Sequence, residues 1–171
     1  MADIAFLLLI FFLVTTTITT DQGINRKLPE PCPTGTDCNA DINQRNILRI
    51  AINRQNQLMV NDLYLDVESL KVVLKEFIDN NGDSSCNYCF GNRLPFSSDN
   101  PQEAAISIET QRNSTYNAFI AVQDELTAAY FELRAAYAKK RFNKALNELT
   151  AQELKMVKEA YPFRISEALI Q

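Results

Sequence analysis

The sequence of 171 residues contains no histidine and only four glycines. Histidine is the commonest general base near neutral pH and the commonest metal ligand, so its absence excludes Ser-His-Asp triads and histidine-containing zinc sites. The glycines, at positions 23, 35, 82 and 91, form neither a G-x-G-x-x-G nor a P-loop spacing. The sequence therefore gives no support to nucleotide binding.

Clustered positive charge is also missing. The chain has 17 Lys and Arg against 21 Asp and Glu, a net charge of −4, whereas a nucleic-acid-binding surface requires grouped Lys and Arg. The carboxylates are scattered over the surfaces of the helices we predict, and no nucleophile is paired with a base. We therefore expect a protein that is not an enzyme, binds no nucleic acid and holds neither a metal nor a cofactor.

The first twenty residues form the most apolar stretch. Ile4 to Val14 is uninterrupted, and threonines extend the uncharged run to Thr20, before Asp21. A helix of this length reaches about 30 Å, the thickness of the hydrocarbon core of a bilayer. The charge at its start is Asp3, and an acid attached to a membrane-spanning helix commonly serves a proton or ion path. We predict a transmembrane helix over residues 1–20 with Asp3 as a candidate functional residue.

A secretory signal peptide is the main alternative, because an apolar core of eleven residues is closer to the length of a signal sequence than to that of a span. However, the stretch has no basic segment at its start and no Ala-x-Ala cleavage pattern before Asp21. A buried core helix is a weaker alternative, since the stretch shows no amphipathic period. The pattern favours a membrane anchor.

The region over residues 21–45 is predicted to be a linker. Pro29, Pro31 and Pro33 fall within five residues, and proline removes backbone donors that a helix or a central strand needs. The rest of the chain, 46–171, is long enough for one domain with its own core.

Hydrophobic periodicity predicts alternating strands and helices in this domain. Strands are expected over 46–53, 57–61, 104–110 and 163–170. Helices are expected over 67–78 after an Asp66 cap, from Ser114 or Thr115 to Arg141, and over 151–160 behind a Thr150-x-x-Glu153 capping box. Residues 79–102, rich in Asn, Ser, Asp and Pro, are predicted to form a long surface insertion. The fold class is α+β, a small sheet with helices packed on one face.

Four cysteines follow the apolar stretch: Cys32, Cys38, Cys86 and Cys89. Outside the cytoplasm disulfides are the default, whereas in the cytosol Cys86-x-x-Cys89 would suit a redox or zinc half-site. The apolar N-terminal segment favours structural disulfides. Four cysteines allow three pairings, and the sequence does not choose between them.

Residues 3–17, Asp-Ile-Ala-Phe-Leu-Leu-Leu-Ile-Phe-Phe-Leu-Val-Thr-Thr-Thr, resemble the membrane helix of the ExbD/TolR family of biopolymer-transport proteins. In that family an aspartate near the start of the single spanning helix carries protons, and the matching position here is Asp3. A second match is Arg26-Lys-Leu-Pro29, which resembles the family's basic or polar residue and Leu-Pro just outside the membrane. Lys27, Leu28 and Pro29 would form this periplasmic motif.

The resemblance implies a single-pass protein of the bacterial inner membrane with its C-terminal domain in the periplasm. It also implies a homodimer within a pentameric ExbB/TolQ-like partner that uses proton-motive force and passes energy to a TonB-like protein. Thr15, Thr16 and Thr17 would either hydrogen-bond to neighbouring helices or form the ordinary interfacial end of the helix. A TolR-like subunit of the Tol system and a secreted binding module with a cleaved signal remain open.

The insertion with two cysteines and the helices over 121–160 depart from the compact family domain and resemble larger ExbD-type versions found in Bacteroidetes-like bacteria. The family's short cytoplasmic tail, which precedes the aspartate, has no counterpart in this sequence. This difference predicts an N-terminally truncated sequence or a start codon further upstream.

Overall fold

The computed structural model describes residues 2–15 and 43–170. The chain divides into two compact units, residues 1–39 and 40–171. The first contains helix α1, Ala2–Thr15. The second is the folded domain, which contains the other helices and all the strands that the structure describes.

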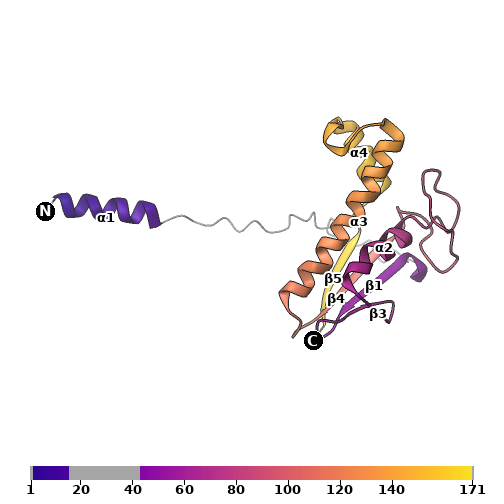
Figure 1. Ribbon diagram of the computed structural model, residues 1–171, viewed down its shortest axis with the longest axis horizontal. Helices are drawn as coiled ribbons and strands as arrows, with labels where there is room; N and C mark the ends of the chain where they lie inside the picture. The colour runs from indigo at the N-terminus through magenta and orange to yellow at the C-terminus, as the bar shows by residue number, and fades with distance from the viewer. Residues whose placement is uncertain (1, 16–42, 171) are drawn as a thin grey trace, which may run out of the picture. The chain divides into compact units, whose positions relative to one another are not determined.

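A mixed sheet of five strands forms one layer of the domain (Figure 1). Its strands are β1 (Ile47–Ile52), β2 (Leu58–Val60), β3 (Leu63–Leu65), β4 (Ala105–Gln111) and β5 (Ile165–Ile170), in the order β3-β2-β1-β4-β5. The first three strands form antiparallel pairs, whereas β4 pairs parallel with both β1 and β5. Parallel neighbours need long connections, and the helices supply them.

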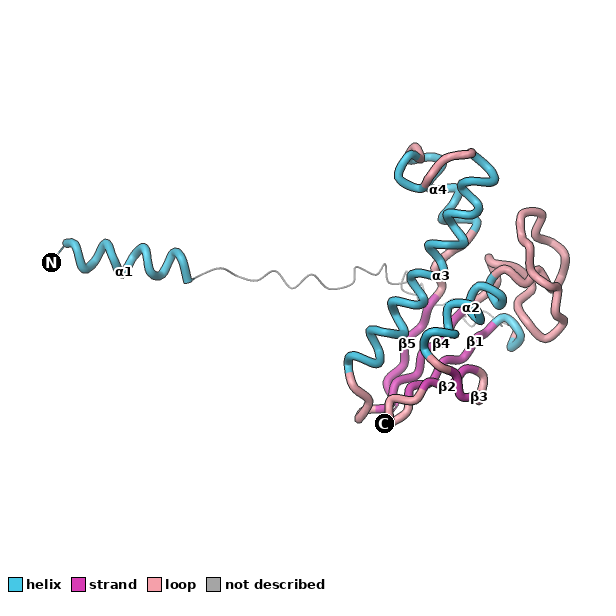
Figure 2. Tube along the Cα trace, in the orientation of Figure 1, coloured by secondary structure: helices cyan, strands magenta, loops and turns pink. Residues whose placement is uncertain are grey.

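Helices α2 (Val67–Ile78) and α3 (Tyr116–Phe142) lie next to each other over one face of the sheet (Figure 2). Between α3 and β5 the chain forms a short 3-10 turn, η2 (Leu146–Glu148), and helix α4 (Ala151–Ala160). Another 3-10 turn, η1 (Gln44–Asn46), leads into β1. The fold is therefore α+β, as the periodicity predicted.

The core lies between the sheet and the two covering helices. β1 alternates buried and more exposed positions along its length, as a strand with one covered face requires. Side chains buried in this core are Leu48, Ile50, Ile52, Leu58, Val60, Leu70, Leu74, Ile78, Ile106, Ile108, Val122, Leu126, Tyr130 and Leu133. Burial of each large apolar side chain stabilises the fold by about 1.5 to 3 kcal/mol.

Local capping signals place the helix starts where the sequence predicts them. Thr115 is the N-cap of α3, where its hydroxyl accepts a hydrogen bond from the Ala118 N–H at 3.3 Å. Thr150 and Glu153 form the expected capping box of α4. Asp66 occupies the N-cap position of α2, but its side chain makes no capping hydrogen bond.

α2 spans Val67–Ile78, as the sequence predicts, with Asp79 as its C-cap, and Gly82 lies beyond the helix and packs against the Ser98 carbonyl. One feature differs from the sequence prediction. A short third strand, β3, continues the hairpin to Leu65. Because its Leu63 and Tyr64 side chains are exposed, β3 lacks the alternation that identifies a half-buried strand.

Candidate functional site

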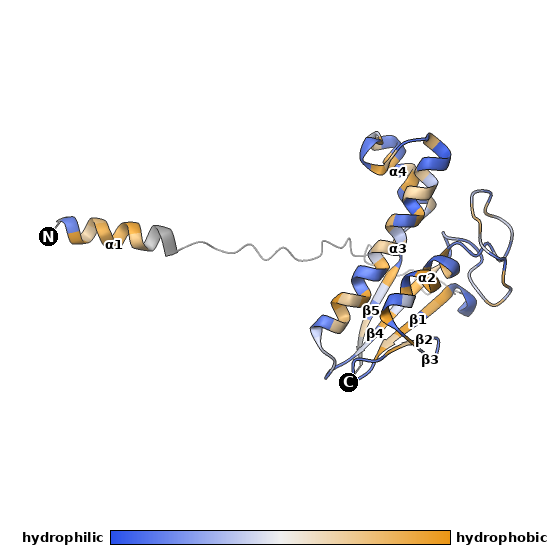
Figure 3. Ribbon diagram, viewed as in Figure 1, coloured by the Kyte–Doolittle hydropathy of each residue, from blue (hydrophilic) through white to orange (hydrophobic). Residues whose placement is uncertain are grey.

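The first candidate residue, Asp3, lies in the first turn of α1. It is the only ionisable residue of that helix, and the side chains from Asp3 to Phe11 are exposed in the chain taken alone. Figure 3 shows the apolar band that follows it. A helix that is apolar on every side needs apolar surroundings on every side.

Among residues 2–15 and 43–170, no helix is both long enough and apolar enough to cross a membrane. The transmembrane helix expected over residues 1–20 thus remains a prediction.

Several predicted residues lie outside the described ranges. They are Thr16, Thr17, Lys27, Leu28, Pro29, Cys32 and Cys38. Thr15 is the last residue of α1. The roles proposed for these residues therefore rest on the sequence.

Cys86 and Cys89 are joined in a disulfide, with their Cα atoms 5.6 Å apart. The bridge lies in the insertion, which we define as residues 79–104, between α2 and β4. It closes a short loop around Asn87 and Tyr88. This pair is therefore a local link within the insertion and does not connect it to another element.

The base of the insertion is held by three consecutive polar residues, all buried: Asp79, Asn80 and Asn81. The Asn80 side chain donates to the Leu94 and Ser98 carbonyls at 2.9 and 2.8 Å and accepts from the Leu94 N–H at 2.8 Å. The Asn81 side chain likewise accepts a hydrogen bond from the Cys86 N–H and donates one to the Cys86 carbonyl. Side-chain amides thus supplement the backbone hydrogen bonds of a loop that forms no regular strand pairing.

Aromatic side chains attach the insertion to the C-terminal part of the domain. Tyr88 contacts Tyr137 of α3 and Tyr161 edge-on, with ring centroids 5.0 and 5.6 Å apart, and its hydroxyl donates to the Ala160 carbonyl at 2.8 Å. The Tyr161 hydroxyl donates to Asp79 at 2.7 Å. Burial and, second, this hydrogen bond raise the pKa of Tyr161 far above its ordinary value. Tyr161 is therefore a neutral hydrogen-bond donor at physiological pH.

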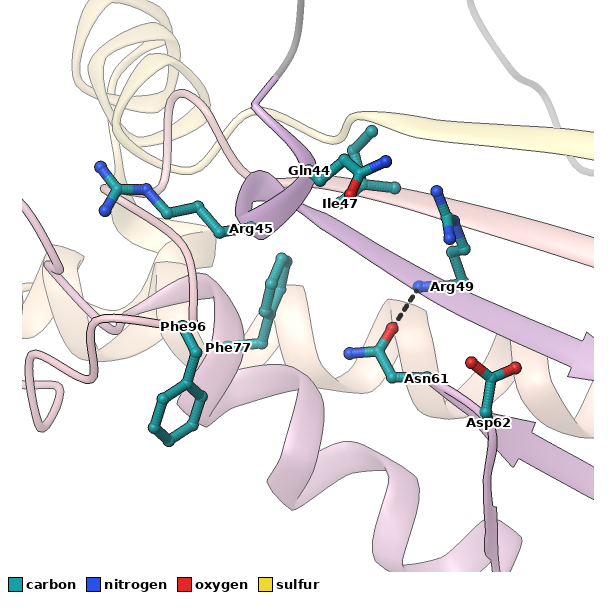
Figure 4. A pocket seen from close by; sticks show the side chains of 8 residues that line it. All are labelled: Gln44, Arg45, Ile47, Arg49, Asn61, Asp62, Phe77 and Phe96. Carbon is teal, nitrogen blue, oxygen red and sulfur yellow. Dashed lines mark hydrogen bonds between the residues drawn. The ribbon is translucent and has the colours of Figure 1, made fainter.

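A cavity of about 180 Å³ lies beside the first half of β1 (Figure 4). It exists because β2 is short, so that only Ile50 to Ile52 of β1 pair with it. The Asn61 side chain ends the ladder by accepting a hydrogen bond from the Arg49 N–H at 3.1 Å. Phe77 and Phe96 form the aromatic part of the lining.

Three charged residues line this cavity: Arg45, Arg49 and Asp62. Arg45 is held by an ion pair with Asp99, which also accepts a hydrogen bond from the Asn46 amide at 2.9 Å. Arg49 is exposed, and no hydrogen bond or ion pair joins its guanidinium to another described residue. No group of three acidic or cysteine side chains within residues 2–15 and 43–170 is placed to hold a metal ion.

Comparison with known families gives one match. The model of the family described as biopolymer transport protein ExbD/TolR matches residues 1–139. The chain belongs to the ExbD/TolR family. A search of curated proteins found no match for it. Family membership implies an energy-transducing role in biopolymer transport and partners within a membrane-associated transport complex.

The match to the ExbD/TolR family ends at Lys139, near the C-terminus of α3. Helix α4 and strand β5 therefore lie outside the matched range, although β5 completes the sheet by pairing with β4 from Ile106 to Gln111. Tyr161, which anchors the insertion through Asp79, also lies beyond the match. The insertion and the C-terminal segment of this family member thus form one connected structure.

Sequence reasoning missed Asn80, Asn81, Asn61 and Tyr161 as structural side chains. Each acts through a hydrogen bond to a residue distant in the chain or to a loop backbone, and periodicity does not detect such contacts. The run Asp79-Asn80-Asn81 directly after an apolar helix was the available signal, since Asp and Asn commonly bond to nearby backbone in loops.

Proposed function

We propose that this protein is the ExbD-like subunit of an inner-membrane motor that uses proton-motive force to energise TonB-dependent transport across the outer membrane. In this proposal Asp3 carries the proton, and two copies sit within a pentameric ExbB/TolQ-like partner. The observation that supports it most directly is the solitary carboxylate at the start of an otherwise apolar helix. Family membership supplies the transport context.

The physical basis is the difference between the two protonation states of Asp3. An ionised carboxylate costs several kcal/mol in the middle of a bilayer, whereas a neutral one is far cheaper. Each charge moved across the membrane potential is worth about 2.3 kcal/mol per 100 mV. Protonation therefore lets the helix leave a polar partner, and deprotonation returns it, which biases rotation or sliding within a ring.

The test replaces Asp3 by Asn in a strain that lacks the native gene. Asn keeps the size and hydrogen bonding of the side chain but does not titrate, so receptor-dependent uptake should be lost while expression and partner co-purification persist. Asp3→Glu should retain partial activity at most, because the added methylene displaces the carboxyl group. Asp124→Asn, the same change at an exposed position of α3, is the matched control and should transport normally. Normal uptake together with an intact outer membrane in the Asp3→Asn strain would refute the proton-carrier role.

A TolR-like role is distinguished by the phenotype. Loss of outer-membrane integrity with normal receptor-dependent uptake in the Asp3→Asn strain would assign the protein to the Tol system. A secreted module would instead show removal of residues up to about Thr20, which mass measurement of the mature protein detects.

A further inference from the structure

The insertion exposes large apolar side chains at its tip, which we define as residues 90–96. Phe90 is 69% exposed, Leu94 38% and Phe96 75%, and residues 92–96 are exposed without interruption. An isolated exposed apolar side chain is ordinary, but several of them on one short segment commonly mark a surface that contacts another body.

Hydrogen bonds and close packing at the base of the insertion hold the tip in place. Asn80 fixes both Leu94 and Ser98, and the Asn80 carbonyl accepts a hydrogen bond from the Arg93 N–H at 2.9 Å. Gly91 packs so closely that an added Cβ would lie 2.2 Å from the Asp79 carbonyl oxygen. The exposure of the apolar side chains is thus built into the fold of the insertion.

The tip and its neighbour α3 present positive charge. No acidic residue occurs from Ser84 to Ser98, whereas Arg93 lies within the tip. Lys140, near the end of α3, places its ammonium 3.9 Å from the centre of the Phe90 ring. An apolar surface combined with cations matches an anionic lipid surface, where aromatic rings enter the interface and cations attract the headgroups.

A second exposed apolar pair, Leu63 and Tyr64 of β3, has the opposite electrostatic setting. It lies between Asp62 and Asp66, and like charge disfavours contact with an anionic bilayer. Charge complementarity therefore selects the insertion tip over β3. The chain between α1 and η1, residues 16–43, can extend to at most about 100 Å, which allows the domain to contact a membrane that holds α1.

From this combination we infer that the insertion tip docks the domain onto the surface of an anionic lipid bilayer, with Phe90, Leu94 and Phe96 entering the interface and Arg93 and Lys140 facing the headgroups. The inference rests on the proposed membrane anchor for its setting. It assigns a role to the insertion in limiting how freely the domain moves above the membrane.

The test uses the full chain in lipid nanodiscs. The protein has no native tryptophan, so a Phe96→Trp variant carries a single fluorescent reporter at the tip. In discs with anionic phosphatidylglycerol and brominated lipid, its emission should shift to the blue and be quenched severalfold, and less in discs of neutral phosphatidylcholine. Adding Arg93→Glu should weaken the quenching. Tyr116→Trp, at a residue 73% exposed at the start of α3, is the matched control and should stay unquenched.

Retention of the chain by the discs separates the two proposals. A chain that neither disc retains would overturn both the anchor and the docking. Retention with the Phe96→Trp emission as unquenched as that of Tyr116→Trp would overturn the docking alone and assign the tip to a protein partner. Equal quenching in neutral and anionic discs would overturn the choice of an anionic surface. Near-ultraviolet circular dichroism verifies that each variant is folded.

Discussion

The core of the domain and its insertion are held together by different interactions. Between the sheet and helices, apolar side chains such as Leu74 and Leu126 are fully buried and depend on being removed from water. In the insertion, buried Asn80 and Asn81 satisfy loop backbone groups through their amides. The core therefore determines whether the domain folds, whereas the insertion amides determine the shape of one surface. This contrast predicts different consequences of mutation in the two regions.

The largest effect is expected from Leu126→Ala in α3. Leu126 is 0% exposed, and truncation of a buried leucine costs about 2 to 5 kcal/mol of unfolding free energy. Urea unfolding followed by near-ultraviolet circular dichroism measures the loss. Phe131→Ala, on the same helix but 61% exposed, is the control and should cost far less. Equal losses for the two variants would contradict the assignment of the core.

A smaller and more local effect is expected from Asn80→Ala. It removes three hydrogen bonds and leaves buried backbone groups of the insertion without partners, at a cost of about 1 to 3 kcal/mol. Hydrogen exchange should accelerate at the Leu94 amide while amides of β1 and β4 remain protected. Asn92→Ala, at an exposed position of the same loop, serves as the control. Uniform acceleration across the sheet would show that the two regions unfold together.

The smallest effect concerns the cap of α4. Hydrogen bonds from Lys144 and, second, from the Thr150 N–H lower the pKa of Glu153 to about 2. The folded pKa lies below the ordinary value of 4.5, so the stabilisation is fully present above pH 4.5 and is lost as the pH falls toward about 2. NMR titration of the Glu153 carboxyl measures this pKa directly. Lys144→Met should raise it, and an unchanged value would show that Lys144 is not the cause.

The sequence predicted regular elements better than it predicted the insertion. Period-two alternation in β1 and the three-to-four-residue stripe in α3 report burial directly, so strand and helix assignments there were confirmed. The insertion obeys no period, because its buried polar side chains include amides that bond to backbone atoms up to 18 residues away. Its position was predicted, but its internal structure was not.

The candidate functional residues also differ in how far the sequence predicted them. Asp3 could be identified from the sequence, because it is a charged residue at the start of a long apolar run. The cavity beside β1 was not, since it arises only where β2 stops short and Asn61 closes the ladder. The insertion tip was expected to be a surface loop, but its contact with Lys140 joins residues 50 positions apart.

The sequence by itself determined the family, the α+β class and the position of the helix caps, because apolar periodicity, capping residues and the N-terminal motif act through neighbours in the chain. Only the tertiary structure decided that Tyr161 holds Asp79 and that β5 completes the sheet beside β4. It also decided which apolar side chains stay exposed. Burial depends on which surfaces meet in three dimensions, and contacts between distant segments leave no local pattern in the sequence.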